Sequence, residues 1–225
     1  MKKAVLSVVA NLKSKPIVGI IIISAFYFFG VIGILSANRE WFVEKTAFNL
    51  SLSFVVLIMY QNHYKFSLIW AFVFCYVVGF LAEYLGVNFG LIFGDYYYPK
   101  TLGPQLGGVP VIIGINWFLI TFCVASLIFP LKTNVFLKIL LATITTVIID
   151  VLIEPVAMEL NFWNWENNEV PLQNYVGWAI VSFLIFSFYF LIKIPLRNKM
   201  SIVLLFWQVV FFVVLNLFLV KNYWA

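Results

Sequence analysis

Seven long apolar segments, separated by short polar stretches, dominate the hydropathy pattern of this 225-residue chain. A transmembrane helix needs about 20 predominantly apolar residues, and most of these segments approach that length. The pattern predicts an all-α fold, a polytopic membrane bundle of about seven transmembrane helices that forms one integral membrane domain over residues 1–225. The predicted helices cover residues 17–36, 46–61, 66–87, 111–131, 135–156, 175–194 and 200–220.

The composition supports a membrane protein and narrows its chemistry. Hydrophobic residues make up 64% of the chain and charged residues only 10%, whereas the surface of a soluble domain must carry more charge. Cys75 and Cys123 lie inside apolar segments, and the single histidine, His63, has no ligand-type neighbours at metal-binding spacing. We therefore expect no metal or cofactor. The net charge of +5 is scattered at segment ends, so no nucleic-acid partner is expected.

Basic residues flank the apolar segments unevenly. With a cytoplasmic N-terminus, ten of the 14 basic residues fall inside and four outside. The positive-inside rule thus predicts a multi-pass protein of the cell (inner) membrane with its C-terminus outside. The inner set is Lys2, Lys3, Lys13, Lys15, Lys65, Lys132, Lys138, Lys193, Arg197 and Lys199, and the outer set is Arg39, Lys45, Lys100 and Lys221.

The acidic residues all fall on the opposite side in this topology. They lie in outer loops or at the outer ends of predicted helices. Because acidic residues contribute little to topology, this is a separate observation. Any carboxylate chemistry is expected near the outer leaflet. The nine residues are Glu40, Glu44, Glu83, Asp95, Asp150, Glu154, Glu159, Glu166 and Glu169.

Three of these carboxylates, Glu83, Asp150 and Glu154, fall inside predicted helices. A charged side chain at the bilayer centre costs about 2.5–3.5 kcal/mol on insertion scales, so such residues are interpreted first as functional. Asp150 and Glu154 are four residues apart and share a helix face. Desolvation and mutual repulsion would favour a proton on one of them, which makes it a candidate donor. The alternative is a solvated position at the interface, where the penalty is small.

The segment from residue 88 to 108 is rich in glycine, proline and tyrosine, which is typical of a structured loop that contributes to a site. Asp95 lies within its aromatic stretch and is a candidate to orient a water or to act as a second proton donor. Tyr96 and Tyr98 are candidate pocket residues. Equally, these tyrosines fit the aromatic belt of a membrane interface.

A short repeat relates two parts of the chain. Val109-Pro110 precedes Trp117 by the spacing at which Val170-Pro171 precedes Trp178, and each pair follows a helix with acidic residues near its outer end. The pattern indicates an internal repeat, in which the third and fourth predicted helices correspond to the fifth and sixth. A pseudo-axis along the membrane normal would bring the acidic ends together.

Further polar and aromatic residues lie in the second half of this repeat. Asn174 lies at the start of the sixth predicted helix, as Asn116 does in the fourth, and Trp163 and Trp165 lie in the loop before the sixth. An amide can hold a water, and an indole face can stabilise a cation. The alternative for the tryptophans is an ordinary interfacial anchor.

No phosphate-binding loop, nucleophile elbow, metal-ligand cluster or flavin motif is visible. Buried carboxylic acids, tyrosines and tryptophans in an apolar enclosure instead suit acid-initiated chemistry on a hydrocarbon. An alkene would be protonated, the carbocation sheltered by aromatic faces, and the cation then quenched.

Several motifs occur in a fixed order between residues 75 and 180. They are Glu83-Tyr84-Leu85-Gly86, Phe93-Gly94-Asp95-Tyr96-Tyr97-Tyr98, Gly108-Val109-Pro110, Trp117, Asp150, Glu154-Pro155, Trp163-Asn164-Trp165, Val170-Pro171-Leu172-Gln173-Asn174 and Gly177-Trp178. In these motifs the chain resembles the CruF-type carotenoid biosynthesis proteins. It departs from their pattern at Glu154, where aspartate is expected, and at Glu169, where glycine is expected.

The resemblance implies a cofactor-independent hydro-lyase, a carotenoid 1,2-hydratase, acting on the acyclic (ψ) end group of a lycopene- or γ-carotene-type carotenoid. Protonation at C2 would leave a tertiary cation at C1, which water attacks. Asp150 or Glu83 is the expected donor, Glu154 a further catalytic acid, and Asp95 and Asn174 would position water. The residues expected to line the substrate pocket are Tyr84, Tyr96, Tyr98, Trp117, Trp163, Trp165 and Trp178.

Three other functions fit the same features. A small membrane carotenoid cyclase would capture the same cation with an internal alkene instead of water. A proton-coupled transporter would also contain repeats and buried carboxylates. A purely structural or assembly subunit is the third. The expected partners are the carotenoid, the lipid bilayer and, by association, other carotenoid enzymes.

Overall fold

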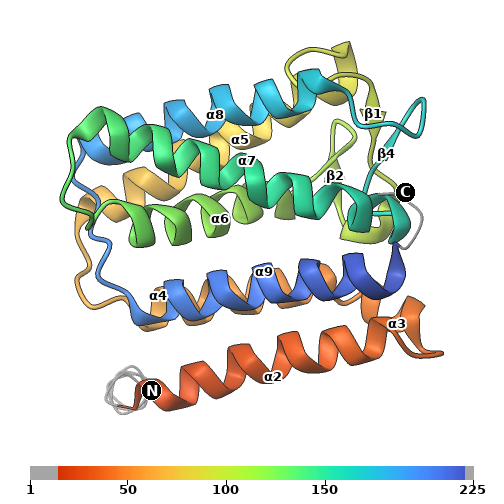
Figure 1. The fold of residues 1–225 in the computed structure, drawn as a ribbon, viewed down its shortest axis with the longest axis horizontal. Helices are drawn as coiled ribbons and strands as arrows, with labels where there is room; N and C mark the ends of the chain where they lie inside the picture. The colour runs from red at the N-terminus through yellow and green to blue at the C-terminus, as the bar shows by residue number, and fades with distance from the viewer. Residues whose placement is uncertain (1–14, 221–225) are drawn as a thin grey trace.

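The computed structural model describes residues 15–220 as a bundle of antiparallel helices (Figure 1). Six helical segments are long and apolar enough to cross a membrane, with Arg39–Met59 counted as one, and α6 is a shorter apolar helix. The prediction of an all-α polytopic membrane bundle is confirmed. The helices are α2 (Pro16–Ile34), α3 (Arg39–Val43), α4 (Thr46–Met59), α5 (Phe66–Phe89), α6 (Ile112–Ile128), α7 (Val135–Glu159), α8 (Leu172–Leu191) and α9 (Lys199–Leu219).

The helix boundaries differ from the expected ones mainly near prolines. Helix α8 begins at Leu172, three residues early, because Pro171 has the extended backbone of an N-cap and leads directly into the helix. Helix α7 continues through Pro155 to Glu159. Near this interruption, Asn216 Nδ2 of α9 donates a hydrogen bond to the carbonyl oxygen of Leu152 (2.7 Å), the residue after Val151, whose carbonyl lacks a helical donor because Pro155 has no N–H.

Helix α6 is the central element of the bundle. It packs against α4, α5, α7, α8 and α9, and most of its residues are buried. Helices α5 and α6 approach closely because each supplies a glycine opposite an aromatic ring of the other. Gly79 of α5 faces Trp117, and Gly114 of α6 faces Tyr76. Small residues at such crossings are typical of helix packing in membranes.

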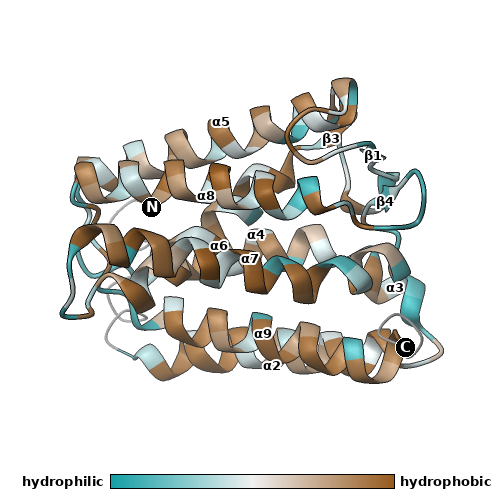
Figure 2. Ribbon diagram, turned by 45° about the horizontal axis from the view of Figure 1, so that its top comes forward, coloured by the Kyte–Doolittle hydropathy of each residue, from teal (hydrophilic) through white to brown (hydrophobic). Residues whose placement is uncertain are grey.

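The outer faces of the helices are apolar. Large side chains such as Phe29, Phe66 and Leu191 are exposed, and Figure 2 shows hydrophobic helix bodies with polar residues concentrated in the loops. In water this surface would be unfavourable, whereas in lipid it is the expected one, because every backbone group is already paired within a helix.

Two pairs of very short strands order the loops at one end of the bundle. Strand β1 (Tyr96–Tyr97) pairs with β4 (Asn164–Trp165), and β2 (Gln105–Leu106) pairs with β3 (Val109–Pro110), both antiparallel. A 3-10 turn, η1 (Lys100–Leu102), lies between β1 and β2. The β1–β4 pair joins the loop after α5 to the loop after α7, so it brings together the ends of the two helices that carry the buried acids.

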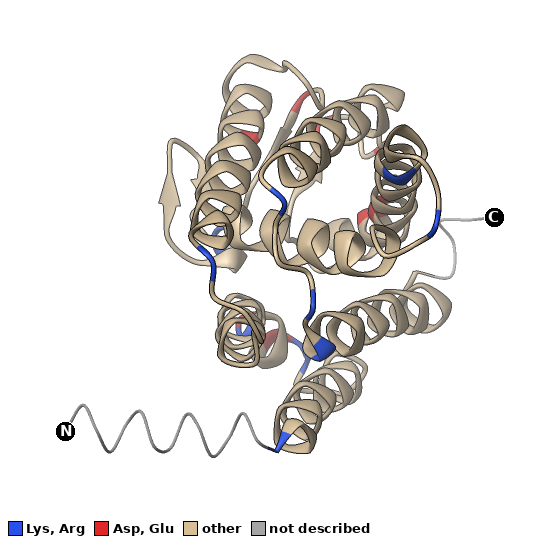
Figure 3. Cartoon of the chain, turned by 90° about the vertical axis from the view of Figure 1, so that its left-hand side faces the viewer, with Lys and Arg blue, Asp and Glu red and all other residues tan. Residues whose placement is uncertain are grey.

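Charges separate between the two ends of the bundle. Figure 3 views the end away from the strands, where Lys and Arg colour the loops. Lys2, Lys3, Lys13 and Lys221, which contributed to the predicted orientation, lie outside the described residues. The assignment of the strand-bearing end to the outer side of the membrane stays a prediction.

We expect Gly79→Ala to lower the thermal stability of the detergent-solubilised protein. A Cβ at this position would lie 2.6 Å from Cγ of Trp117 and 2.9 Å from its Cβ, atoms that move only if α6 shifts. Overpacking of this kind costs about 1–3 kcal/mol. Gly30→Ala is the matched control, because the nearest atom to its added Cβ is 3.7 Å away. Equal melting temperatures for the two variants would contradict this packing.

Candidate active site

The three intrahelical acids converge at the strand-bearing end of the bundle. Glu83 lies on α5, and Asp150 and Glu154 lie one turn apart on α7. Their exposed fractions are 5%, 0% and 1%, so all three are removed from solvent. The alternative, in which these acids are solvated at the interface, does not agree with this burial. The partners of each carboxyl therefore decide what it can do.

Glu83 accepts three hydrogen bonds. Its Oε2 accepts from the hydroxyls of Tyr96 (2.6 Å) and Tyr98 (2.7 Å), and its Oε1 accepts from Nε1 of Trp117 (3.0 Å). Burial and the nearby Glu83 raise the pKa of Tyr96 and Tyr98 well above its usual value, so both phenols keep their protons and remain donors. With three donors, the Glu83 carboxylate is well stabilised in its charged form.

Glu154 is held in the same way by a different set of donors. Its Oε2 accepts from Nε1 of Trp163 and Nε1 of Trp165, both at 2.9 Å. Its Oε1 accepts from Nδ2 of Asn174 (3.0 Å), which also donates to Oδ2 of Asp150 (2.8 Å). The Asn174 amide of α8 thus links the two acids of α7.

Asp150 differs from the other two acids. Asn174 donates a hydrogen bond to its Oδ2, and its Oδ1 has no hydrogen-bond partner within residues 15–220. A buried carboxylate with so few donors is costly, whereas a protonated carboxyl supplies a donor of its own. The hydrogen bonding therefore favours a neutral Asp150 beside charged Glu154.

Stacked aromatic rings lie next to the acids. The rings of Trp117 and Trp178, which occupy equivalent positions in the sequence repeat, stack with centroids 4.1 Å apart. Phe93 adds a third ring, 6.3 Å from Trp117 and 6.5 Å from Trp178. Aromatic faces of this kind attract a positive charge. The site therefore combines carboxyl groups with a surface suited to a carbocation.

A small cavity opens among these groups. Its volume is about 20 Å³, which is enough for one water, since a water needs about 10–15 Å³. Its polar lining offers the two to four partners that such a water requires. The lining residues are Glu83, Phe93, Tyr96, Tyr98, Ile113, Asn116, Trp117, Glu154, Trp163, Trp165, Asn174 and Trp178.

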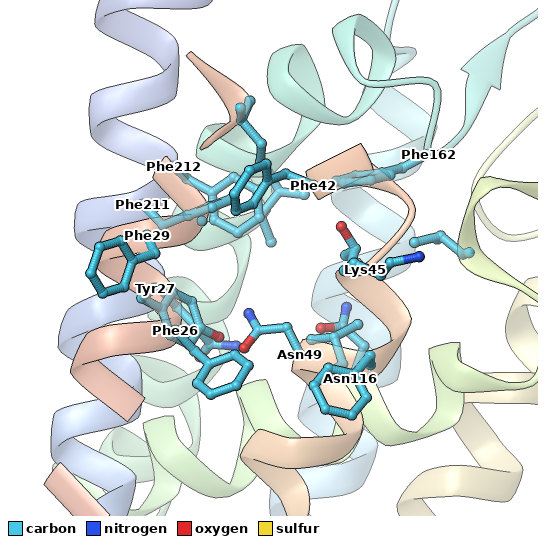
Figure 4. Close-up of a pocket in the computed structure, with 18 of the residues that line it drawn as sticks. Phe26, Tyr27, Phe29, Phe42, Lys45, Asn49, Asn116, Phe162, Phe211 and Phe212 are labelled. Atoms are coloured by element: carbon cyan, nitrogen blue, oxygen red, sulfur yellow. The ribbon is translucent and has the colours of Figure 1, made fainter. Parts of the chain in front are cut away.

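A much larger apolar cavity of about 600 Å³ adjoins the small one. The two share Ile113, Asn116 and Trp163 in their walls. Residues of α2, α3, α4, α6, α7 and α9 line the large cavity, many of them aromatic (Figure 4). The sequence did not predict this cavity, because its apolar lining residues follow the same pattern as residues that face lipid.

The structure brings ten of the twelve predicted site residues to this cluster and leaves two outside. Asp95 is exposed, because side chains alternate along β1 and Tyr96 points inward. Tyr84 follows Glu83 on α5 and turns away from it, toward Gly107 and Phe89. The expected water-positioning role of Asp95 and the pocket role of Tyr84 are therefore corrected.

Two lining residues, Phe93 and Ile113, were not singled out in the sequence, whereas the amide of Asn116 was. Phe93 is the first residue of the motif Phe93-Gly94-Asp95-Tyr96-Tyr97-Tyr98. Its position next to Gly94 in this motif could have identified it as a site residue. Ile113 and Asn116 lie on one face of α6, three residues apart, and contribute to both cavities. Only packing shows that this face of α6 is the wall between them.

Comparison with known proteins adds independent evidence. A family model described as carotenoid biosynthesis protein matches residues 45–225. A bisanhydrobacterioruberin hydratase from Haloarcula japonica is 31% identical over 119 residues, which are 48% of this chain and 41% of that relative. The chain therefore matches less than half the length of this relative. No solved structure matches the chain.

We expect infrared difference spectra at neutral pH to show the C=O band of a protonated carboxyl that disappears in Asp150→Asn. The reason is that Asp150 accepts a hydrogen bond from Asn174 alone among the side chains of the described residues that act as donors to it, whereas Glu83 accepts three. Glu83→Gln is the matched control and should retain the band. Loss of the band in Glu83→Gln with retention in Asp150→Asn would contradict the assignment.

Proposed function

The chain belongs to the carotenoid biosynthesis protein family, and from this premise we propose that it is a membrane hydratase that adds water to the terminal 1,2 double bond of an acyclic carotenoid end group. The observation that carries the proposal is the pair of adjoining cavities. One is acid-lined with room for a water, and the other is apolar and far larger. The Haloarcula relative is named a hydratase, which supports the same class of reaction.

The large cavity fits an apolar substrate. Its volume of about 600 Å³ lies within the range of about 300–1,000 Å³ typical of small-molecule sites. The end of a polyene in this cavity would reach the shared wall at Ile113, Asn116 and Trp163. There it would meet the water and the carboxyl groups of the smaller cavity.

The proposed reaction begins with proton transfer from the Asp150–Glu154 pair. Asp150 holds the proton, and Glu154, which lines the small cavity, delivers it to C2 of the alkene. The π electrons form the new C2–H bond, and a tertiary cation remains at C1. The charged Glu83 and the faces of Trp117 and Trp178 would stabilise this cation.

Water then completes the hydration. A water held by Asn174 and Glu154 attacks C1 through its oxygen and forms the C–O bond. Its surplus proton returns to the carboxylate pair, so the acid is regenerated and the sum is addition of one water. Asn174 is well placed for this because it already contacts both acids.

Cyclisation is the competing reaction of the same cation. It would require the folded end group, with its internal alkene, to lie against the acids. The acid-lined cavity of about 20 Å³ favours a water there over a folded hydrocarbon. We also propose, from the distribution of basic residues, a cytoplasmic N-terminus and a site near the outer leaflet of the cell membrane.

Expression in a lycopene-producing host is expected to yield carotenoids heavier by one water, detected by chromatography with mass measurement. Asp150→Asn should lower the yield by about 10²–10⁴-fold, the usual contribution of a general acid. Asp95→Asn is the matched control, because this aspartate is exposed and lies outside the site, and it should leave the yield unchanged. A product of unchanged mass would indicate cyclisation, and full hydration by Asp150→Asn would refute the proposed donor.

A further inference from the structure

The large cavity contains a group of buried polar side chains that the proposed reaction does not use. We call Tyr27, Asn49, Ser53 and Gln208 the amide cluster. Tyr27, Asn49 and Gln208 line the cavity, and Tyr27, Ser53 and Gln208 are nearly inaccessible, with exposed fractions of 4%, 2% and 4%. The cluster comes from α2, α4 and α9, whereas the buried acids come from α5 and α7.

Two oxygens of the amide cluster are unsatisfied. Oδ1 of Asn49 and Oε1 of Gln208 are buried and have no hydrogen-bond partner among residues 15–220. The Tyr27 hydroxyl faces Ser53 and Gln208, and Figure 4 shows the Asn49 side chain pointing toward Tyr27. A buried amide oxygen without a donor is unfavourable, and polar residues inside a membrane bundle are generally functional. The cluster therefore points to a donor supplied by a ligand.

We propose that the amide cluster binds a hydroxyl group of the polyene, so that the preferred substrate is an acyclic carotenoid that already carries an alcohol. This inference rests on the proposed function for the identity of the polyene. An alcohol donates one hydrogen bond to an amide oxygen and can accept another from an amide N–H or a phenol. Apart from Lys45, Thr46 and Asn116, the remaining lining of the cavity is hydrophobic or aromatic and suits the hydrocarbon part of the same molecule.

Other polar groups fit the amide cluster less well. A carboxylate or phosphate would meet two carbonyl-type oxygens and no charged partner within the cluster. Lys45, the cation in the cavity wall, is exposed, lies 3.8 Å from Glu44 and stands over the ring of Trp41. A ketone accepts hydrogen bonds only and leaves the amide oxygens without a donor.

A hydroxyl bound at this cluster would fix how far the polyene enters. Because the cluster lines the large cavity and the acids lie at the adjoining small one, an alcohol held at the cluster would direct a double bond of the polyene toward the acids. The alcohol would thus act as a positioning group, and affinity for it would be separable from the chemistry at Asp150 and Glu154.

Binding of matched polyenes tests this inference. The full-length protein in detergent is titrated with three ligands: an acyclic polyene hydrocarbon, the same polyene bearing a tertiary alcohol, and the corresponding ketone. The affinity for each ligand is measured from the quenching of tryptophan fluorescence. We expect the wild type to bind the alcohol about threefold to tenfold more tightly than the hydrocarbon, the net effect of one hydrogen bond. Gln208→Met and Asn49→Leu should reduce this ratio to about one without weakening the hydrocarbon.

Asn62→Leu is the matched control, because Asn62 is exposed in the loop after α4 and lies outside both cavities. Equal wild-type affinities for alcohol and hydrocarbon, or tighter binding of the ketone, would overturn the inference without any variant. Hydration is measured separately in the lycopene-producing host. If the protein does not hydrate the carotenoid but still binds the alcohol more tightly than the hydrocarbon, the proposed function alone is refuted. If it hydrates the carotenoid but binds the two ligands equally, only the proposed role of the amide cluster is refuted.

Discussion

The structure depends on the satisfaction of carboxyl groups buried in an apolar bundle. Glu83 and Glu154 each receive three hydrogen bonds, two from the loop that follows the acid's own helix and one from the next helix along the chain. Without these donors two buried charges would be strongly unfavourable. The ordering of the loops after α5 and α7 is therefore tied to the acids, and the β1–β4 pair holds these loops in the required register.

Helix α6 connects this polar centre to the rest of the bundle. One of its faces carries Ile113 and Asn116 in the wall between the cavities, and the adjoining Trp117 reaches Glu83. Its close approach to α5 depends on Gly79, where no side chain intervenes. The helix is thus at once the packing centre of the fold and the partition between the apolar cavity and the acids.

The distribution of polarity within the molecule would separate recognition from chemistry in the proposed reaction. The buried carboxyl groups and their donors lie at the strand-bearing end, while the larger cavity is apolar apart from a few neutral polar groups and the exposed Lys45. A hydrocarbon is held by packing in such a cavity, and a carbocation is formed only where aromatic faces and carboxylates meet it. The same separation allows a neutral amide cluster to select a ligand without changing the protonation of the acids.

The sequence by itself determined the helices and the identity of the acids. Apolar runs of spanning length have few alternatives to a membrane helix, and three carboxylates within them are conspicuous because charge there is costly. Only the tertiary structure decided which neighbours complete the site. Tyr96 faces inward while Asp95 faces outward, and Tyr27 meets Gln208 across 181 positions of sequence. Cavities and hydrogen bonds of this kind depend on packing between distant segments, which hydropathy does not encode.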